Sequence, residues 1–191
     1  MTLTPERADS LAAALYDARL TRVPIAPLTE ADPDLTLADG YAVQQGVVRR
    51  YLDAGDRIIG YKLGLTSKPM QQMLNVPTPD FAPVMASHVI TDGAAVAISD
   101  YIAPRLEAEI ALVLGDDLEG PDCTALDVLR ATEGAVASIE LVDSRVADWK
   151  IKLADTVADM ASSGSIIVSG RVVPIDDLDL RTTGMVFTRD G

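Results

Sequence analysis

The spacing of apolar residues changes along the chain from a helical period to an extended one. After Thr4 and again after Thr36, apolar residues recur every three to four positions, which predicts two amphipathic helices. Both threonines are good helix N-caps, and Gly55 marks the end of the second helix. Beyond it, apolar and polar residues alternate, as is typical of strands. The pattern predicts a small helical lobe over residues 1–55 and a β-rich domain over residues 56–191.

The individual elements follow from the same pattern. The second helix is expected to bury Leu37, Tyr41, Val48 and Leu52, and the proline-containing segment 23–33 to connect the helices. Later elements are expected as strands at 57–66, around Val89 and at 95–98, 105–114, 137–142, 165–168 and 183–188, as short helices at 67–74, 124–131 and 154–161, and as a proline-rich loop at 75–83.

The predicted strand 105–114 carries two carboxylates in an apolar setting. Glu107 and Glu109 are two positions apart, so they share one face of the strand. Adjacent carboxylates repel each other and are costly to bury, and a divalent cation relieves both costs. Glu140, in the apolar run 137–142, supplies a third carboxylate. Hard oxygen ligands of this kind suit Mg²⁺ or Mn²⁺.

A half-exposed strand explains the same residues without a metal. Glutamate is usually a surface residue, and a Glu-x-Glu pair facing water needs no ligand. The pattern of Glu107, Glu109 and Glu140 leaves both interpretations open.

Composition limits the class of partner. The formal net charge of −13 argues against nucleic acid or an anionic membrane surface. No run reaches the roughly 18 apolar residues that a membrane span requires. Cys123 is the single cysteine, which excludes an intrachain disulfide and fits a reducing cytoplasm. We therefore expect a cytoplasmic protein that acts on a small molecule.

Several motifs occur together in a fixed order and carry a family resemblance. They are Gly60-Tyr61-Lys62-Leu63-Gly64-Leu65-Thr66, Pro79-Asp80-Phe81, Arg105-Leu106-Glu107-Ala108-Glu109, Ile139-Glu140-Leu141-Val142-Asp143-Ser144-Arg145, and Asp148-Trp149 followed by Asp155-Thr156-Val157-Ala158-Asp159. From about Asp34 to its end, the chain resembles the 2-keto-4-pentenoate hydratase family of the fumarylacetoacetate-hydrolase-like superfamily. Close relatives include 2-oxohept-3-ene-1,7-dioate hydratase and 4-oxalocrotonate decarboxylase.

The resemblance implies a site and a fold. It implies a Mg²⁺ or Mn²⁺ ion held by Glu107, Glu109 and Glu140, a catalytic lysine at Lys62 and a nearby acid at Asp80. It also implies an α+β fold, in which a mixed, mostly antiparallel β roll carries peripheral helices. Members of the family usually oligomerise, so a homo-oligomer is expected, with residues 56–191 as the catalytic domain.

The chain departs from the family pattern in two places. Met160 stands where relatives carry asparagine after the Val-Ala-Asp segment, and relatives continue through a further C-terminal section that packs into the roll. We therefore expect part of the roll to be missing. Residues 183–188 should then form a strand at a sheet edge or against a partner subunit, followed by a hairpin turn at 189–191.

Three functions are compatible with these residues. The first is a hydratase that adds water to a 2-hydroxy-2,4-dienoate in the catabolism of aromatic compounds. The second is a metal-dependent decarboxylase acting on a 2-oxo-3-enedioate, since chelation of a 2-oxo acid serves either reaction. The third is a shortened, non-catalytic homologue that acts as an oligomer subunit.

Overall fold

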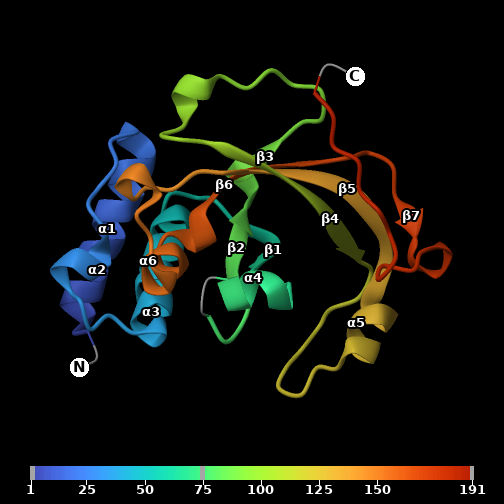
Figure 1. The fold of residues 1–191 in the computed structure, drawn as a ribbon, viewed down its shortest axis with the longest axis horizontal. Helices are drawn as coiled ribbons and strands as arrows, with labels where there is room; N and C mark the ends of the chain where they lie inside the picture. Colours follow the sequence, from blue (N-terminus) through green and yellow to red (C-terminus); the bar gives the residue numbers. More distant parts are fainter. Residues whose placement is uncertain (1–2, 74–75, 190–191) are drawn as a thin grey trace. The chain divides into compact units, whose positions relative to one another are not determined.

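The computed structural model describes residues 3–73 and 76–189 (Figure 1). The chain divides into two compact units. Unit 1 comprises residues 1–89, 95–105 and 141–165, and unit 2 comprises residues 90–94, 106–140 and 166–191. The predicted helical lobe, residues 1–55, falls within unit 1, and the units do not follow the predicted boundary at residue 56. Among the described residues, no helix is both long and apolar enough to cross a membrane.

Two long helices of unit 1 begin where the sequence predicts. Helix α1 (Pro5–Thr21) starts after Thr4, whose side chain accepts a hydrogen bond from the Arg7 amide. Helix α3 (Leu37–Asp53) starts after Thr36, which forms a capping box with Asp39. The two helices pack against each other around a core that includes Leu11, Leu15, Val43 and Val47.

The buried face of α3 differs from the predicted one. Tyr51 is buried, whereas Leu52 is 43% exposed. The buried side of α3 differs from the predicted one because the helix packs against α1 and also against α6 (Leu153–Ala158), which lies about 100 residues further along the chain. Gly40 permits the second approach, since a Cβ there would lie 2.9 Å from the Ala154 carbonyl oxygen. The expected connector 23–33 contains the short helix α2 (Leu28–Ala31).

Unit 1 also holds the antiparallel pair β1 (Ile58–Gly64) and β2 (Asp80–Met85). The sequence predicted a loop through residue 83, and that prediction was wrong from Asp80 onwards. Pairing with β1 draws the segment into a strand despite Pro83, because β2 is an edge to which β1 supplies the only partner that the described residues show. Helix α4 (Lys68–Met73) lies between the two strands in sequence, and the end of its predicted range falls outside the described residues.

A second sheet has the strand order β3-β6-β5-β4, with β7 paired to β5. Its strands are β3 (Val89–Ile90), β4 (Arg105–Leu114), β5 (Thr132–Val142), β6 (Ser163–Val168) and β7 (Val173–Pro174). Together with the helices, the two sheets make the chain an α+β protein, as predicted. Residues 95–98 are not a strand, because the chain there turns into a 3₁₀ helix, η2 (Ile98–Asp100). The other 3₁₀ helices are η1 (Ala86–His88), η3 (Ala147–Trp149), η4 (Met160–Ser162) and η5 (Ile175–Asp177).

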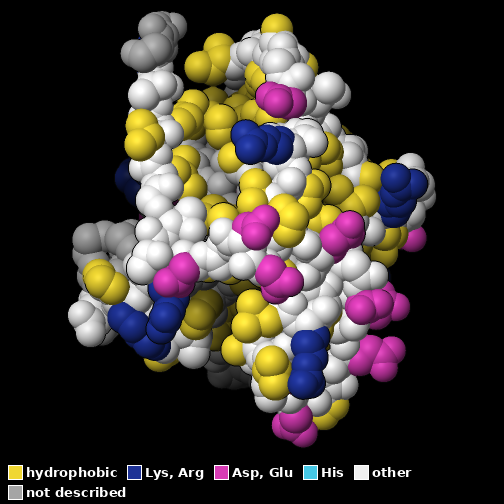
Figure 2. All heavy atoms as spheres, turned by 90° about the vertical axis from the view of Figure 1, so that its right-hand side faces the viewer, with side chains coloured by type: hydrophobic (Ala, Val, Ile, Leu, Met, Phe, Trp, Pro, Cys, Tyr) yellow, Lys and Arg dark blue, Asp and Glu magenta, His cyan; other side chains and the backbone are white. Residues whose placement is uncertain are grey.

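In unit 2, strand β4 leaves one apolar side open. Its even-numbered residues Leu106, Ile110, Leu112 and Leu114 are all exposed. Hydrophobic side chains are interspersed with acidic ones on the face drawn in Figure 2. Helix α5 (Ala125–Ala131) follows β4 within the predicted helical range 124–131 and starts with a capping box of Thr124 and Asp127.

The predicted C-terminal strand is absent. Residues 183–188 form no strand, and Met185, Val186 and Phe187 are exposed. A strand needs hydrogen bonds to a neighbouring strand, and the part of the chain that the structure describes shows no strand paired with residues 183–188. The predicted hairpin turn extends into residues 190–191, which lie outside the described part of the chain.

Candidate active site

Lys62 and Asp80 share one face of the β1–β2 pair. Gly64 is opposite Asp80, and Lys62 is opposite Ala82. Side chains alternate across a strand, so residues 62, 64, 80 and 82 point to the same side. Asp80 is buried and Lys62 is half-buried. The register therefore places on one face the two side chains that the family resemblance implies as a catalytic lysine and a nearby acid.

Gly64 makes room for the Asp80 carboxyl group. A Cβ atom at position 64 would lie 2.1 Å from Asp80 Oδ1 and 3.1 Å from its Cγ. Any other residue at this position would push the carboxyl group aside. Gly60 lies four residues earlier on the same strand, and a Cβ atom added there would have no neighbour within 4 Å.

The Lys62 ammonium group is anchored to an unusual loop. Its Nζ donates a hydrogen bond of 2.8 Å to the Ala161 carbonyl oxygen. Met160, Ala161 and Ser162 have φ values of 55°, 50° and 53°, so three consecutive non-glycine residues are left-handed. Each such residue costs about 1–2 kcal/mol, and the loop must be held by its surroundings.

A buried arginine makes many of the contacts that hold the loop. The Arg145 guanidinium donates to the carbonyl oxygens of Asp143 at 2.5 Å and Ser163 at 2.6 Å, and also to the Asp159 carbonyl oxygen and carboxylate. The Asp143 amide donates to the Ser162 carbonyl oxygen at 2.8 Å. The carbonyl groups at both ends of the loop are thereby tied down.

Asp159 is the charged partner inside this network. Burial raises the pKa of Asp159 to about 6, although the Arg145 guanidinium and the Ser144 hydroxyl act to lower it. The Arg145 amide donates to Asp159 Oδ2 at 3.0 Å, and the Ser144 hydroxyl donates to the same oxygen at 3.3 Å. A buried pair of this kind is expensive to break, because either partner alone would leave an unpaired charge inside the protein.

The three predicted metal ligands lie on neighbouring strands of one sheet. Glu107 and Glu109 are on β4 and Glu140 is on β5. Glu107 is exposed, Glu109 is half-buried and Glu140 is 5% exposed. The donor set suits a hard divalent cation, since all three side chains offer carboxylate oxygens and a cation would offset the cost of burying Glu140.

These carboxylates do not form a metal-binding cluster in the structure. Within residues 3–73 and 76–189, no group of three His, Cys, Asp or Glu side chains is arranged to hold a metal ion. The assignment of Glu107, Glu109 and Glu140 as ligands therefore stays a prediction. It agrees with the donor chemistry and the strand placement and awaits a binding measurement.

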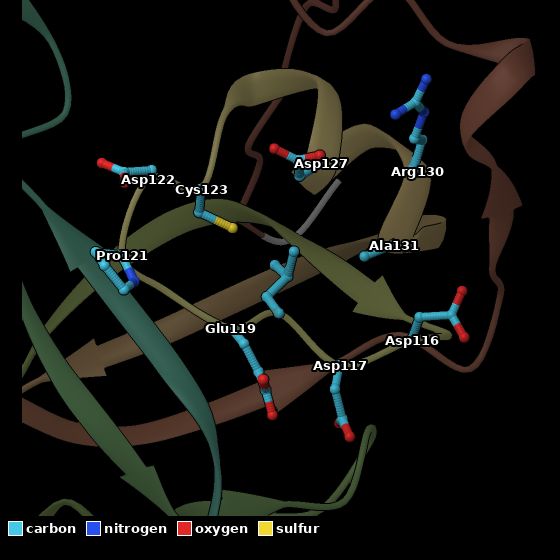
Figure 3. A pocket seen from close by; sticks show the side chains of 10 residues that line it. Asp116, Asp117, Glu119, Pro121, Asp122, Cys123, Asp127, Arg130 and Ala131 are labelled. Atoms are coloured by element: carbon cyan, nitrogen blue, oxygen red, sulfur yellow. The ribbon is translucent and has the colours of Figure 1, made fainter.

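One cavity of unit 2 is lined by none of the predicted site residues. It has a volume of about 350 Å³ and is shown in Figure 3. Its lining comes from the β4–α5 loop and from α5, namely Asp116, Asp117, Leu118, Glu119, Pro121, Asp122, Cys123, Asp127, Arg130 and Ala131. Five of these ten side chains are acidic and one is basic, so the cavity would repel an anionic 2-oxo acid.

Sequence reasoning missed the residues that position the candidate lysine. Arg145 and Asp159 lie within recognised motifs, but the pattern gave no reason to expect them to meet. The available signal was a charged residue inside the apolar run 157–161, which predicts a buried and therefore paired carboxylate. His88, the single histidine of the chain, is buried, and the centroid of its ring lies 5.0 Å from that of Tyr51 at an interplanar angle of 89°.

Comparisons with known proteins find similar enzymes. The chain is 44% identical over 178 residues to 2-hydroxypent-2,4-dienoate hydratase from Pseudomonas putida, covering 93% of this chain and 80% of that protein. It is 40% identical over 189 residues to 2-keto-4-pentenoate hydratase from Paraburkholderia xenovorans, covering 99% of this chain and 70% of that protein. No family model matches the chain.

A solved structure shares the fold. The 4-oxalocrotonate decarboxylase of Pseudomonas putida G7, complexed with magnesium and adipate, superposes with a TM-score of 0.90 at 36% sequence identity. The match covers 95% of this chain and 69% of the decarboxylase. The same decarboxylase complexed with calcium and acetate gives a TM-score of 0.88.

Proposed function

The chain belongs to the 2-keto-4-pentenoate hydratase family of the fumarylacetoacetate-hydrolase-like superfamily, and from this we propose that it is a hydro-lyase acting on a 2-hydroxy-2,4-dienoate. The product is a 4-hydroxy-2-oxo acid, formed in the meta-cleavage catabolism of aromatic compounds. The observation that carries the proposal is the high identity to named hydratases along most of the chain.

Lys62 and Asp80 handle the protons of this reaction. The substrate is first ketonised, so the proton of its 2-hydroxyl group leaves and a proton is added at the far end of the diene. Water then adds across the resulting conjugated enone. Support for these roles comes from the common face of the two side chains and from the bond that fixes Lys62 Nζ on the Ala161 carbonyl oxygen. A positioned acid–base group contributes typically about 10²–10⁴-fold to a rate.

Glu107, Glu109 and Glu140 would hold a divalent cation, with Mg²⁺ as the preferred ion. A bound cation would polarise the 2-keto oxygen as a Lewis acid. The glutamates would hold the cation on strands β4 and β5, where Glu140 is buried. The magnesium in the related decarboxylase structure supports the choice of ion.

The proposal extends to the fold of the sheet and to the oligomeric state. The antiparallel registers of β1–β2 and β5–β7 support a mostly antiparallel roll. We expect a homo-oligomer, which light scattering of the purified protein would measure.

The central test is turnover of 2-hydroxypenta-2,4-dienoate with Mg²⁺ present. Conjugation is lost on hydration, so the ultraviolet absorbance of the dienoate should fall, and the product should gain the mass of one water. An unchanged absorbance at saturating Mg²⁺ would reject the hydratase proposal.

The metal assignment has its own test with a matched control. Glu140→Gln should weaken Mg²⁺ binding by about 10–100-fold, because it removes a charged ligand from a buried position. Glu133→Gln, an exposed residue of the same strand, should leave the affinity unchanged. Titration calorimetry measures both variants, and equal affinities would remove Glu140 from the ligand set.

Decarboxylation of a 2-oxo-3-enedioate is the second candidate function. The structural similarity to 4-oxalocrotonate decarboxylase favours it. The two reactions differ in mass balance, because decarboxylation releases carbon dioxide and hydration consumes water. Incubation with 4-oxalocrotonate, followed by mass spectrometry, decides between them.

A further inference from the structure

We propose that Arg145 is a positioning residue for Lys62 and acts through the left-handed loop 160–162. In this arrangement Arg145 holds the loop, and the loop directs the Ala161 carbonyl oxygen at Lys62 Nζ. The inference rests on the proposed function in one respect, since it assumes that Lys62 is the catalytic lysine.

The first step of the argument is how the loop is held. Arg145 donates to the carbonyl oxygens of Asp159 and Ser163, which flank the loop on either side. The Ser162 carbonyl oxygen accepts from the Asp143 amide, and the Ser162 amide donates to the Asp159 carbonyl oxygen at 2.9 Å. These contacts fix the direction of the peptide groups around Ala161.

The second step is that Ala161 would not adopt this conformation by itself. Left-handed φ values are unfavourable for alanine, and here three such residues follow one another. A loop that relaxed to ordinary φ values would rotate the Ala161 carbonyl group away from Lys62. The hydrogen bond from Lys62 Nζ to the Ala161 carbonyl oxygen therefore depends on the contacts that keep the loop left-handed.

The third step is why an arginine is needed. The guanidinium is a planar fork whose N–H groups reach the Asp159 carboxylate and the carbonyl oxygens of Asp143, Asp159 and Ser163 at once. A lysine keeps the charge that pairs with Asp159 but has one nitrogen from which to donate. Arg145→Lys therefore separates the charge from the geometry.

Chemical reactivity of the lysines tests the proposal without any need for activity. Acetylation by sulfo-N-hydroxysuccinimide acetate, followed by mass spectrometry, gives the rate at Lys62 relative to exposed Lys150 in the same molecule. In Arg145→Lys, the relative rate at Lys62 should rise about tenfold, the factor expected when one hydrogen bond to a charged group is lost. A relative rate equal to that of the wild type would overturn the proposal.

Kinetics give a second readout. Arg145→Lys should lower kcat about tenfold with a much smaller change in KM, because Arg145 orients the proton carrier and binds no substrate. Val47→Ala, a substitution in the helical core, serves as the control for lost stability alone. It should leave both the Lys62 labelling and kcat unchanged at temperatures where the fold is intact.

A milder variant keeps the proposal testable if Arg145→Lys does not fold. Thr156→Val removes the 3.2 Å contact between the hydroxyl groups of Thr156 and Ser162 and leaves Arg145 in place. It should raise Lys62 labelling in the same direction by a smaller factor, and unchanged labelling would then count against the loop as the positioning element. Raised labelling in a protein that hydrates no dienoate would sustain the positioning role and reject the proposed function instead.

Discussion

The strand pair β1–β2 and the strand β4 both carry candidate catalytic groups, yet they are held in very different ways. On β2, Ala82 and Met85 are fully buried, and this strand packs on α3, α6 and the loop 160–162. On β4, the apolar side with Leu106 and Leu112 is exposed. Lys62 and Asp80 therefore lie on the packed side of their strand pair, whose other side exposes apolar residues such as Leu63, whereas two of the three glutamates lie on β4, whose apolar side is exposed.

This difference indicates where the site is already organised. Lys62 and Asp80 are positioned by residues of unit 1. Lys62 donates a hydrogen bond to the Ala161 carbonyl oxygen, and the Asp80 carboxyl group occupies the room that Gly64 leaves without a side chain. Glu107 is exposed and Glu109 is half-buried on β4, and within residues 3–73 and 76–189 no three such side chains are arranged to hold a metal ion. We infer that metal binding would organise the carboxylates, while the lysine is positioned by the fold itself.

The largest effect is expected for Lys62→Met. Turnover of the dienoate should fall by about 10³-fold, because a positioned acid–base group is lost. Mg²⁺ affinity should change little, since the predicted ligands are on other strands. Steady-state kinetics and calorimetry measure the two quantities, with Lys150→Met as the exposed control. Near-normal turnover in Lys62→Met would refute the role of the lysine.

Truncation of one apolar residue in each region tests the packing contrast directly. Met85→Ala should lower the free energy of unfolding by about 2–5 kcal/mol, because it opens a cavity in a closed core. Leu112→Ala should cost less than about 1 kcal/mol, since that side chain is already 39% exposed. Urea denaturation followed by the fluorescence of Trp149 gives both values. Equal costs would mean that β4 is as well packed as β2.

The pH dependence of stability should reveal His88 in the packed region. Burial, together with the positive charges of Arg19 and Arg145, lowers the pKa of His88 from 6.5 to about 4. The unfolded chain then binds a proton that the folded protein excludes, so stability is lost as the pH falls from 6.5 towards 4. The loss amounts to at most about 3 kcal/mol.

Asp159 opposes this loss, because its raised pKa of about 6 makes the folded protein bind a proton first as the pH falls. His88→Phe removes the histidine and keeps Asp159, so the difference in stability between the variant and the wild type reports the contribution of His88 alone. Relative to the wild type, the variant should gain stability between pH 7 and pH 4 in urea titrations. Parallel profiles would show that His88 does not titrate in this way.

The smallest effect is expected for Gly64→Ala. The new Cβ would displace the Asp80 carboxyl group from Gly64, so kcat should fall about tenfold. Stability should hardly change, because a side chain can move aside more easily than backbone. Gly60→Ala is the matched control, since a Cβ there meets open space. A similar loss of kcat in both variants would place the cause in the strand and not in Asp80.

Several features of the fold could be read from local sequence because their causes are local. The helices after Thr4, Thr36 and Thr124 begin where a hydroxyl side chain caps the first turn. The strand with Glu107 and Glu109 follows from its alternation. Lys62 and Asp80 were predicted through a family resemblance, and their shared face depends on a register that the sequence did not specify.

Other features depended on partners distant in the chain. Asp80 begins a strand and not a loop because β1 pairs with it, and residues 183–188 form no strand because none of the described strands pairs with them. The helix expected to reach residue 161 ends at Ala158 because Arg145 draws the following carbonyl groups into a left-handed loop. Capping and alternation are properties of adjacent residues, so the sequence alone determines them. Register, left-handed backbone and the anchoring of Lys62 require groups up to 99 positions apart to meet, and only the tertiary structure decides that.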